Sequence, residues 1–450
     1  MSDPGEPPAE ESEVDFLPDD FPPQLGPSLL LVAGAALTGL LIGLIGVGFL
    51  YLLNAGTALR NGLAAAMAGW PPGTGLLVFS CLAAGAAGLA GWMVGRFAPT
   101  AGGSGVPYVE KILRGHQQPH HVRVLPVKFI GGLIALSSGL VLGREGPMVQ
   151  MGAVVGEKLG RWFPVMRNAW KPLMAAGAGA GLATAFNAPA GGTIFILEEV
   201  LRKVTPVAFT LAATAAIAAT YVQRALFHMG QDYTVAVTPE SPAGAVWLFL
   251  LFGAVIGLFG TIYNRLLLWL VDLARQMRKV PVALRAASIG LLVGCIGWFL
   301  PEWVGGGDAI TQSVLSGPIP VGLFLGIAAI RFFIGPLSYA AGTPGGLFAP
   351  IIALGALIGA AAGSLQQIVF PELVPSPAAF AVAGMAAFFT ATIRAPITGI
   401  VICLEMTGCY SLFFPMLATC LGAYLVPTLM KNVPIYDALA VPHDAPAPGA

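Results

Sequence analysis

Residues 143–156 read GREGPMVQMGAVVG, and residues 346–359 read GLFAPIIALGALIG. In both stretches a glycine opens the motif and a proline follows four positions later, which is typical of a turn that leads into a helix N-terminus. Glycine or proline recurs at four matched places, each 203 positions apart: Gly143 with Gly346, Pro147 with Pro350, Gly152 with Gly355, and Gly156 with Gly359.

A second pair of stretches repeats in the same order. NAPAGGTIFILEE (187–199) matches RAPITGIVICLEM (394–406) at an offset of 207. The high apolar content common to these stretches does not readily explain two matches in the same order at nearly the same offset. The matches therefore indicate two structural repeats, over about 30–225 and 244–440. Broken apolar segments at corresponding places in two repeats point to a transport site between them.

The composition predicts an integral membrane protein with many spans. The chain has 450 residues, of which 56% are hydrophobic and only 10% are charged, whereas soluble domains carry roughly 25% charged residues. So few charges cannot cover the surface of a soluble globule. Apolar segments, some full-length and some short or interrupted by Gly and Pro, predict an all-α fold with broken and partial-span helices. They run at about 28–57, 74–95, 125–142, 147–160, 171–198, 206–226, 244–272, 286–300, 319–336, 345–369, 377–405 and 410–429.

The charges divide the chain into a tail and a membrane domain. Residues 1–27 hold eight acidic residues and no Lys or Arg, and this Pro-rich segment is expected to be a disordered leader, with a docking role as the alternative. The membrane domain is expected over 28–440, followed by a short tail at 441–450. The basic stretch 273–285 lies between two connections without Lys or Arg, which places it in the cytoplasm by the positive-inside rule.

Three motifs open apolar helical runs: GGSGVP (102–107), GREGP (143–147) and GGLFAP (345–350). A helix N-terminus presents free N–H groups and about half a positive charge. Ends of this kind that converge inside the membrane would hold an anion without a buried Lys or Arg, which would bind it too tightly for release.

Together these motifs identify a family. GSGVP, GREGPMVQ and GGLFAP, with RVLPVKF (123–129), FNAP (186–189) and IRAP (393–396), stand in the order found in the CLC family of chloride channels and chloride/proton exchangers, which the chain resembles over about 30–440. The resemblance implies inverted repeats and a homodimer with one pore per subunit. It also implies chloride and protons as transported ions and no cofactor. The chain ends soon after Tyr436, so we expect a prokaryotic-type protein, the membrane domain alone, in the cell inner membrane with both termini cytoplasmic.

The resemblance also implies an anion pathway. Its central site would use the hydroxyls of Ser104 and Tyr436, for which a helix cap and an interfacial anchor are the alternatives. Backbone N–H groups complete the pathway, at Leu347 and Phe348 for the central site and around Arg144, Glu145 and Gly146 for the outer site.

Three glutamates are candidates for gating and proton transfer. Glu145 lies within an apolar run, where an ionisable residue is a functional candidate, although a structural pair with Arg144 is the alternative. Family alignment makes Glu145 the gate, Glu199 the internal proton acceptor, and Glu198 a helper that pairs with Lys128. The acidic cluster that often follows GSGVP in the family is reduced to Glu110, which leaves the cytoplasmic proton route open.

The expected function is therefore secondary active exchange of chloride for protons. A passive chloride channel on the same scaffold, or an exchanger for another anion such as nitrate, is the alternative; a membrane-embedded enzyme is the third. The sequence lacks the GxSxG and HExxH motifs and has no Cys/His metal spacing, so neither an enzyme nor a metal site is expected. The Lys and Arg residues in excess over Asp and Glu lie in the cytoplasmic connections between apolar segments and do not form one basic face. No nucleic-acid partner is therefore expected.

Overall fold

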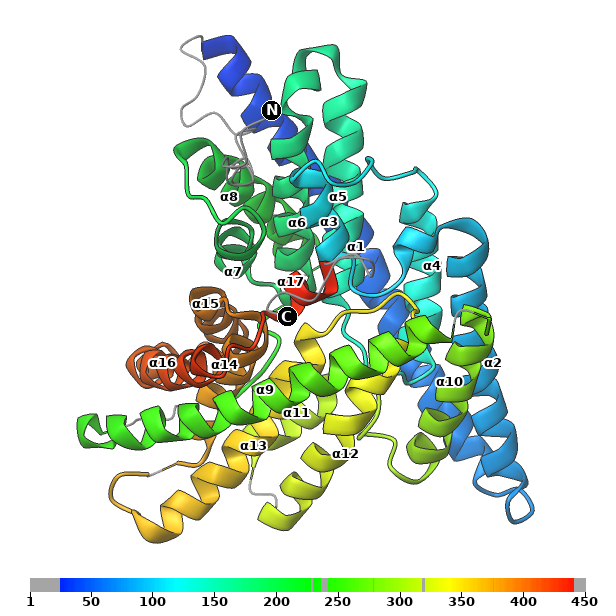
Figure 1. Cartoon of the computed structure of the whole chain (residues 1–450), viewed down its shortest axis with the longest axis vertical. Helices are drawn as coiled ribbons and strands as arrows, with labels where there is room; N and C mark the ends of the chain where they lie inside the picture. Colours follow the sequence, from blue (N-terminus) through cyan, green and yellow to red (C-terminus); the bar gives the residue numbers. More distant parts are fainter. Residues whose placement is uncertain are drawn as a thin grey trace, which may run out of the picture.

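The computed structural model describes residues 25–227, 230–235, 242–277, 279–317, 320–374 and 376–440. Over these ranges the chain is helical, and its only β-type pairing is two isolated bridges (Figure 1). The all-α prediction is confirmed. The two tails expected at 1–27 and 441–450 lie outside the described residues, except that the first helix begins at Leu25.

The first half contains eight α-helices with short π and 3-10 turns. They are α1 (Leu25–Met67), α2 (Thr74–Phe97), η1 (Pro99–Ala101), α3 (Val106–Leu113), α4 (Val124–Ser137), α5 (Glu145–Trp162), η2 (Pro164–Ala169), α6 (Trp170–Phe186), α7 (Pro189–Phe195), the π-turn η3 (Ile196–Val200), α8 (Pro206–Tyr221) and the π-turn η4 (Val222–Leu226).

The second half follows the same plan and adds a short final helix. Its elements are η5 (Ala243–Ala245), α9 (Val246–Gln276), α10 (Val282–Phe299), α11 (Asp308–Ser316), α12 (Val321–Ala340), α13 (Phe348–Val369), α14 (Ala378–Ile393), α15 (Pro396–Thr407), η6 (Tyr410–Leu412), α16 (Phe413–Leu429) and α17 (Ile435–Ala440).

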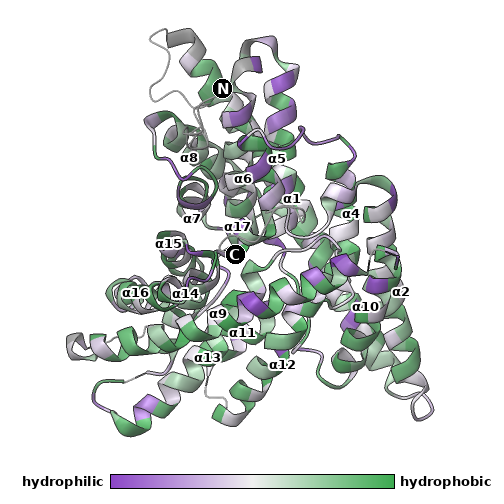
Figure 2. Ribbon diagram, in the orientation of Figure 1, coloured by the Kyte–Doolittle hydropathy of each residue, from purple (hydrophilic) through white to green (hydrophobic). Residues whose placement is uncertain are grey.

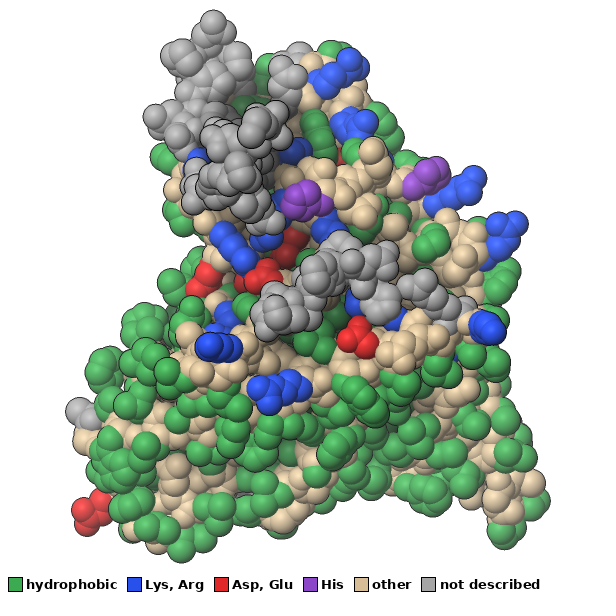
Figure 3. Space-filling view, in the orientation of Figure 1, with side chains coloured by type: hydrophobic (Ala, Val, Ile, Leu, Met, Phe, Trp, Pro, Cys, Tyr) green, Lys and Arg blue, Asp and Glu red, His purple; other side chains and the backbone are tan. Residues whose placement is uncertain are grey.

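The surface of the molecule suits a bilayer. Eight helices among the described residues are long and apolar enough to span a membrane, and many Leu, Phe and Trp side chains on them are exposed. Figure 2 shows hydrophobic residues along the outer helices, and Figure 3 shows hydrophobic side chains over most of the lower part of the face, with Lys and Arg mainly in the upper part and along its right edge. An integral membrane protein with many spans, as predicted, follows from this surface.

Two long apolar runs are interrupted at the same place in each repeat. The run predicted at 171–198 divides at Asn187 (φ 48°) into α6 and α7, and the run at 377–405 divides at Arg394 (φ 75°) into α14 and α15. Each left-handed residue is followed by Ala-Pro, and proline cannot continue the preceding helix because it lacks an N–H. The expected broken helices are therefore present.

The matched glycines of the two repeats allow the same close helix crossing. A Cβ on Gly152 would lie 2.0 Å from the carbonyl oxygen of Gly177, and one on Gly355 would lie 2.1 Å from that of Gly384. In this way α5 crosses α6, and α13 crosses α14, with backbone nearly touching backbone. Small residues at such crossings are how membrane helices approach each other closely.

The two repeats also cap each other's broken helices. The Glu198 carboxylate accepts hydrogen bonds from the N–H groups of Ile397 (3.1 Å) and Thr398 (2.7 Å), at the start of α15. Equivalently, the Glu405 carboxylate accepts from Ala190 (3.1 Å) and Gly191 (2.8 Å), at the start of α7. Both acceptors and both pairs of donors are 207 positions apart, so equivalent residues exchange equivalent bonds. A carboxylate at a helix N-terminus satisfies free N–H groups and complements the helix dipole.

This exchange predicts a stability effect. Glu405→Ala should lower the melting temperature of the detergent-solubilised protein, because two N–H groups lose a charged acceptor and each such bond contributes about 1.5–3 kcal/mol. Glu405→Gln, which keeps one acceptor oxygen, should cost less. The matched control is Glu372→Ala at an exposed turn. Equal melting temperatures for Glu405→Ala and this control would contradict the capping role.

Candidate functional site

The site lies where the two repeats meet, at a pair of equivalent glycines. Gly143 and Gly346 exchange both backbone hydrogen bonds, with N···O distances of 2.8 and 2.7 Å. Because the two residues are equivalent in the repeats, a local two-fold axis passes between them. Directly after this bridge α5 begins at Glu145 and α13 begins at Phe348, so two helix N-termini lie beside each other in the interior.

The Glu145 carboxylate lies against the start of α13. Its Oε1 accepts a hydrogen bond of 2.7 Å from the backbone N–H of Phe348, while its Oε2 has no hydrogen-bond partner among the residues that the structure describes. The residue is 1% exposed. A carboxylate thus takes the place at a helix N-terminus that an anion would take.

Glycine is required around this carboxylate because a side chain would occupy its place. A Cβ on Gly346 would lie 2.1 Å from Glu145 Oε1, and one on Gly143 would lie 2.0 Å from Oε2. Gly143 of GREGP and Gly346 of GGLFAP are therefore glycine for a steric reason: any side chain there would overlap the Glu145 carboxylate.

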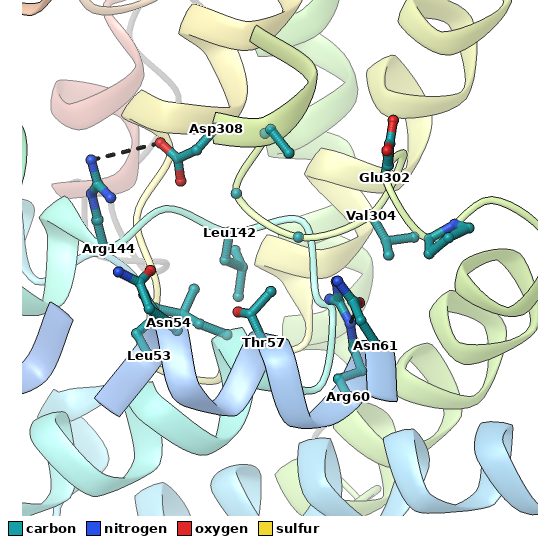
Figure 4. Close-up of a pocket in the computed structure, with 16 residues that line it drawn as sticks. Leu53, Asn54, Thr57, Arg60, Asn61, Leu142, Arg144, Glu302, Val304 and Asp308 are labelled. Atoms are coloured by element: carbon teal, nitrogen blue, oxygen red, sulfur yellow. Dashed lines mark hydrogen bonds and ion pairs between the residues drawn. The ribbon is translucent and has the colours of Figure 1, made fainter. Parts of the chain in front are cut away.

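Arg144 is held by other partners than Glu145. Its Nη2 lies 2.5 Å from Asp232 Oδ2 and 3.6 Å from Asp308 Oδ1, so the alternative of a structural Arg144–Glu145 pair is not what the structure contains. Figure 4 shows Arg144 and Asp308 at one side of a cavity of about 250 Å³. A polar face of α1 lines the same cavity with Asn54, Thr57, Arg60 and Asn61.

Ser104 faces a second cavity. Its Oγ accepts from the N–H of Val106, the first residue of α3, at 3.3 Å, but the N-cap position is Gly105, so Ser104 is not the cap residue of this helix. The bond leaves the hydroxyl hydrogen available for a ligand. This cavity, of about 410 Å³, also contains Lys111, Arg275 and Arg285 and no acidic lining residue. It shares no lining residue with the first cavity. Ser104 and Gly146 meet closely, since a Cβ on Gly146 would lie 2.8 Å from Ser104 Cα.

Tyr436 is inside the protein, which rules out the alternative of an interfacial anchor. It is 0% exposed, its ring centroid lies 5.9 Å from that of Phe348, and its hydroxyl has no hydrogen-bond partner among the described residues. A buried hydroxyl without a partner is costly, so it suits a ligand at this place. The structure thus brings Phe348, and with it the adjoining Leu347, to both Glu145 and Tyr436.

Glu198 and Glu199 point to different partners. Glu199 is 3% exposed, with Oε1 lacking a hydrogen bond and lying 3.8 Å from Nη2 of Arg202. Glu198 instead caps α15, as described above. The predicted Glu198–Lys128 pair is wrong, because the buried Lys128 donates to the carbonyls of Ala101 (3.1 Å) and Gly103 (2.7 Å) before Ser104.

Several site residues were not found from the sequence. The Tyr339 hydroxyl accepts from the N–H of Ser104 at 3.4 Å, and Asp232 and Asp308 hold Arg144. Sequence patterns gave no signal for these long-range contacts. Glu110 was noted only as an isolated acid, whereas the structure buries both of its carboxylate oxygens without hydrogen bonds.

Comparisons with known proteins agree with this geometry. The family model described as voltage gated chloride channel matches residues 85–428. The chain is 41% identical over 357 residues to an H(+)/Cl(-) exchange transporter ClcA of Vibrio cholerae, covering 77% of this chain and 76% of the relative. It is 37% identical over 422 residues to a protein of the same name from Salmonella paratyphi A, covering 91% and 88%.

Solved structures are similar as well. A slow cyanobacterial Cl-/H+ antiporter superposes with a TM-score of 0.87 at 31% identity, over 91% of this chain and 97% of the other. A CLC-type fluoride/proton antiporter, at 21% identity and a TM-score of 0.74, shares the fold over 91% of this chain and 97% of the other.

The close approach at the bridge yields a structural prediction. Gly346→Ala should displace the Glu145 carboxylate from the Phe348 N–H and lower the melting temperature, because the new Cβ takes the position of Oε1. An experimental structure of the variant and a melting curve measure both effects. Gly326→Ala in α12, where nothing lies within 4 Å of the added Cβ, is the control and should be neutral or slightly stabilising. A Glu145 side chain that stays in place would contradict the prediction.

Proposed function

Because the chain belongs to the CLC family of voltage gated chloride channels, we propose that it exchanges chloride for protons across a membrane as a secondary active transporter. The observation that carries the mechanism is the Glu145 carboxylate hydrogen-bonded to the first N–H of α13. A single side chain there can act both as an anion and as a proton carrier.

Competition at the helix ends would couple the two ions. Ionised Glu145 satisfies the N–H of Phe348, and chloride arriving at the same donors must displace it. The displaced carboxylate leaves the partial positive charge of the helix N-termini and becomes easier to protonate. Chloride binding and protonation of Glu145 therefore favour each other, which links the two ions at one site.

The remaining predicted residues support the rest of the route. Ser104 and Tyr436 offer hydroxyl donors, and Leu347 and Phe348 offer backbone donors, for a dehydrated chloride without a fixed positive charge. The amides around Arg144 and Gly146 offer an outer position. We assign Glu199 as the internal proton acceptor, because it is buried beside a partly exposed Arg202.

The assembly and its orientation are part of the proposal. We expect a homodimer with one pore per subunit, in the cell inner membrane with both termini cytoplasmic. The charge pattern supports this orientation, since the basic stretch 273–285, which runs from the end of α9 to the start of α10, is expected on the cytoplasmic side. Apolar surface on two helices is available for a partner: Phe209, Ile217 and Tyr221 on α8, and Phe413, Phe414, Leu417, Leu421 and Leu425 on α16.

The proposal is tested by measuring chloride and proton flux together on purified protein in liposomes. An imposed chloride gradient should drive protons uphill. A reversal potential equal to the chloride Nernst potential at every pH gradient would contradict exchange and would indicate a passive channel. Replacing chloride by nitrate in the same assay tests the alternative anion.

Glu145→Gln should keep chloride permeation and abolish proton movement. The neutral amide resembles the protonated side chain in shape but carries no proton. Both fluxes are measured in liposomes at several pH values, and the chloride flux should lose its pH dependence. Persistent proton pumping by this variant would place the gate elsewhere.

The two neighbouring glutamates should behave differently. Glu199→Gln should abolish proton movement and retain chloride movement, because the buried acid is lost. Glu198→Gln should keep the coupling ratio, because an amide oxygen can still accept from the start of α15. Both effects are read from the reversal potential. Equal coupling in the two variants would contradict this division of roles.

The Tyr436 hydroxyl should contribute to chloride affinity. Tyr436→Phe removes one neutral hydrogen bond, about 0.5–1.5 kcal/mol, which corresponds to roughly two- to tenfold weaker binding in calorimetry. Tyr51→Phe, on an exposed face of α1, is the control. Unchanged affinity in Tyr436→Phe would remove Tyr436 from the central site.

A further inference from the structure

Arg202 connects the candidate proton acceptor to the last helix of the chain. Its Nη2 lies 2.6 Å from Asp437 Oδ1 and 3.8 Å from Glu199 Oε1, and its Nε donates to the Glu199 carbonyl at 3.2 Å. Arg202 has a left-handed backbone, with φ 52°, which is unfavourable for a residue with a side chain. The strained turn brings the guanidinium back over the residue three positions earlier and toward α17.

Asp437 directly follows Tyr436, so α17 carries one residue of each ion's pathway. The Tyr436 ring is fully buried beside Phe348, while the Asp437 side chain is 24% exposed and pairs with Arg202. The helix has only six residues, and so its position depends on such side-chain contacts more than on its own hydrogen bonds. A force on Asp437 is therefore transmitted directly to Tyr436.

A third carboxylate is buried at the same place. Glu110 of α3, which packs against both α17 and η3, is 1% exposed, and within the described part of the chain neither of its oxygens has a hydrogen-bond partner. The charges of Glu110, Glu199, Asp437 and Arg202 act on one another. Glu199 and Asp437 thus share one guanidinium, and Glu110 places a third acidic group beside them.

The other charged groups nearby do not change this sharing. Arg114, directly after α3, acts on Glu110, and Glu198 of η3 faces the start of α15. The one cation that contacts both Glu199 and Asp437 within salt-bridge distance among the described residues is Arg202.

We propose that the Asp437–Arg202 pair is a latch that couples the position of Tyr436, and so access to the chloride site, to the proton acceptor Glu199, with Asp437 as a positioning residue. When Glu199 is protonated, Arg202 is left to Asp437, and α17 holds Tyr436 in place. When Glu199 has given its proton to the pathway, its negative charge competes for Arg202, the pair with Asp437 weakens, and Tyr436 is released. Tyr436 is therefore released more often after proton transfer; in Glu199→Gln it is released less often, which lowers the chloride flux without abolishing it. This inference rests on the proposed function and adds a residue to it.

Two variants with opposite expected effects test the latch in the full-length protein. Hydrogen–deuterium exchange of the peptide that contains α17 should be about two- to fivefold faster in Asp437→Asn, the factor for one partly exposed ion pair. It should be slower than wild type in Glu199→Gln, where no carboxylate competes for Arg202. Asp437→Glu should restore the wild-type rate. Asp272→Asn, which breaks the exposed pair of Asp272 with Arg275, is the control and should change nothing.

Transport provides the second readout. In liposomes the reversal potential of Asp437→Asn should move toward the chloride Nernst potential, because Tyr436 opens without a proton, and Asp437→Glu should move it back. A purely structural defect would reduce both fluxes in proportion and leave the reversal potential unchanged.

The outcomes separate the latch from the proposed function. If wild-type protein does not couple chloride to protons, the proposed transport function fails. The hydrogen–deuterium exchange rates of the α17 peptide alone then decide whether the latch exists. The latch is overturned if the hydrogen–deuterium exchange rate of α17 in Asp437→Asn equals that of wild type. It is also overturned if that rate rises while the reversal potential of a protein that couples the two ions stays unchanged.

Discussion

Two helix N-termini beside each other in a membrane interior need negative charge between them, and much of this structure follows from that need. Each end carries about half a positive charge and several free N–H groups, and lipid supplies no water to satisfy them. Glu145 supplies the charge from the start of α5 to the start of α13. The Glu145 side chain has rotatable bonds, so its carboxylate can turn away from the helix ends. An anion that binds the same N–H donors can then take its place.

The repeats provide the geometry that this arrangement requires. Equivalent glycines exchange hydrogen bonds at the bridge, and Glu198 and Glu405 exchange caps at the broken helices. Tight glycine crossings between α5 and α6, and between α13 and α14, fix the direction of the two helix ends. The Arg144 guanidinium forms its ion pairs with Asp232 and Asp308 rather than with Glu145. The site therefore depends on helix ends rather than on a buried cation, which permits binding and release.

Local patterns predicted most of the fold, because Gly and Pro have strict backbone meanings, whereas the central site residues came from the family resemblance and their roles stay predictions. The offsets of 203 and 207 paired the stretches that form the bridge and the caps, but they did not predict the contacts themselves. The Glu198–Lys128 pair was wrong, since nothing in a local pattern shows that Lys128 finds two carbonyls instead. Asp437 and Tyr339 were missed for the same reason: their partners lie 235 positions away in the chain. The partners of charged and hydroxyl side chains depend on the tertiary structure. A repeat pattern predicts the order of the helices but not these individual contacts.

The central claim is that chloride and the Glu145 carboxylate compete for the same helix ends. It is tested most directly by the protons taken up when chloride binds, measured by calorimetry of chloride binding in two buffers with different ionisation enthalpies. Wild-type protein should take up protons on binding chloride, because the displaced carboxylate is protonated, and Glu145→Gln should bind chloride with little or no proton uptake. The same proton uptake in both proteins, or none in the wild type, would contradict the account.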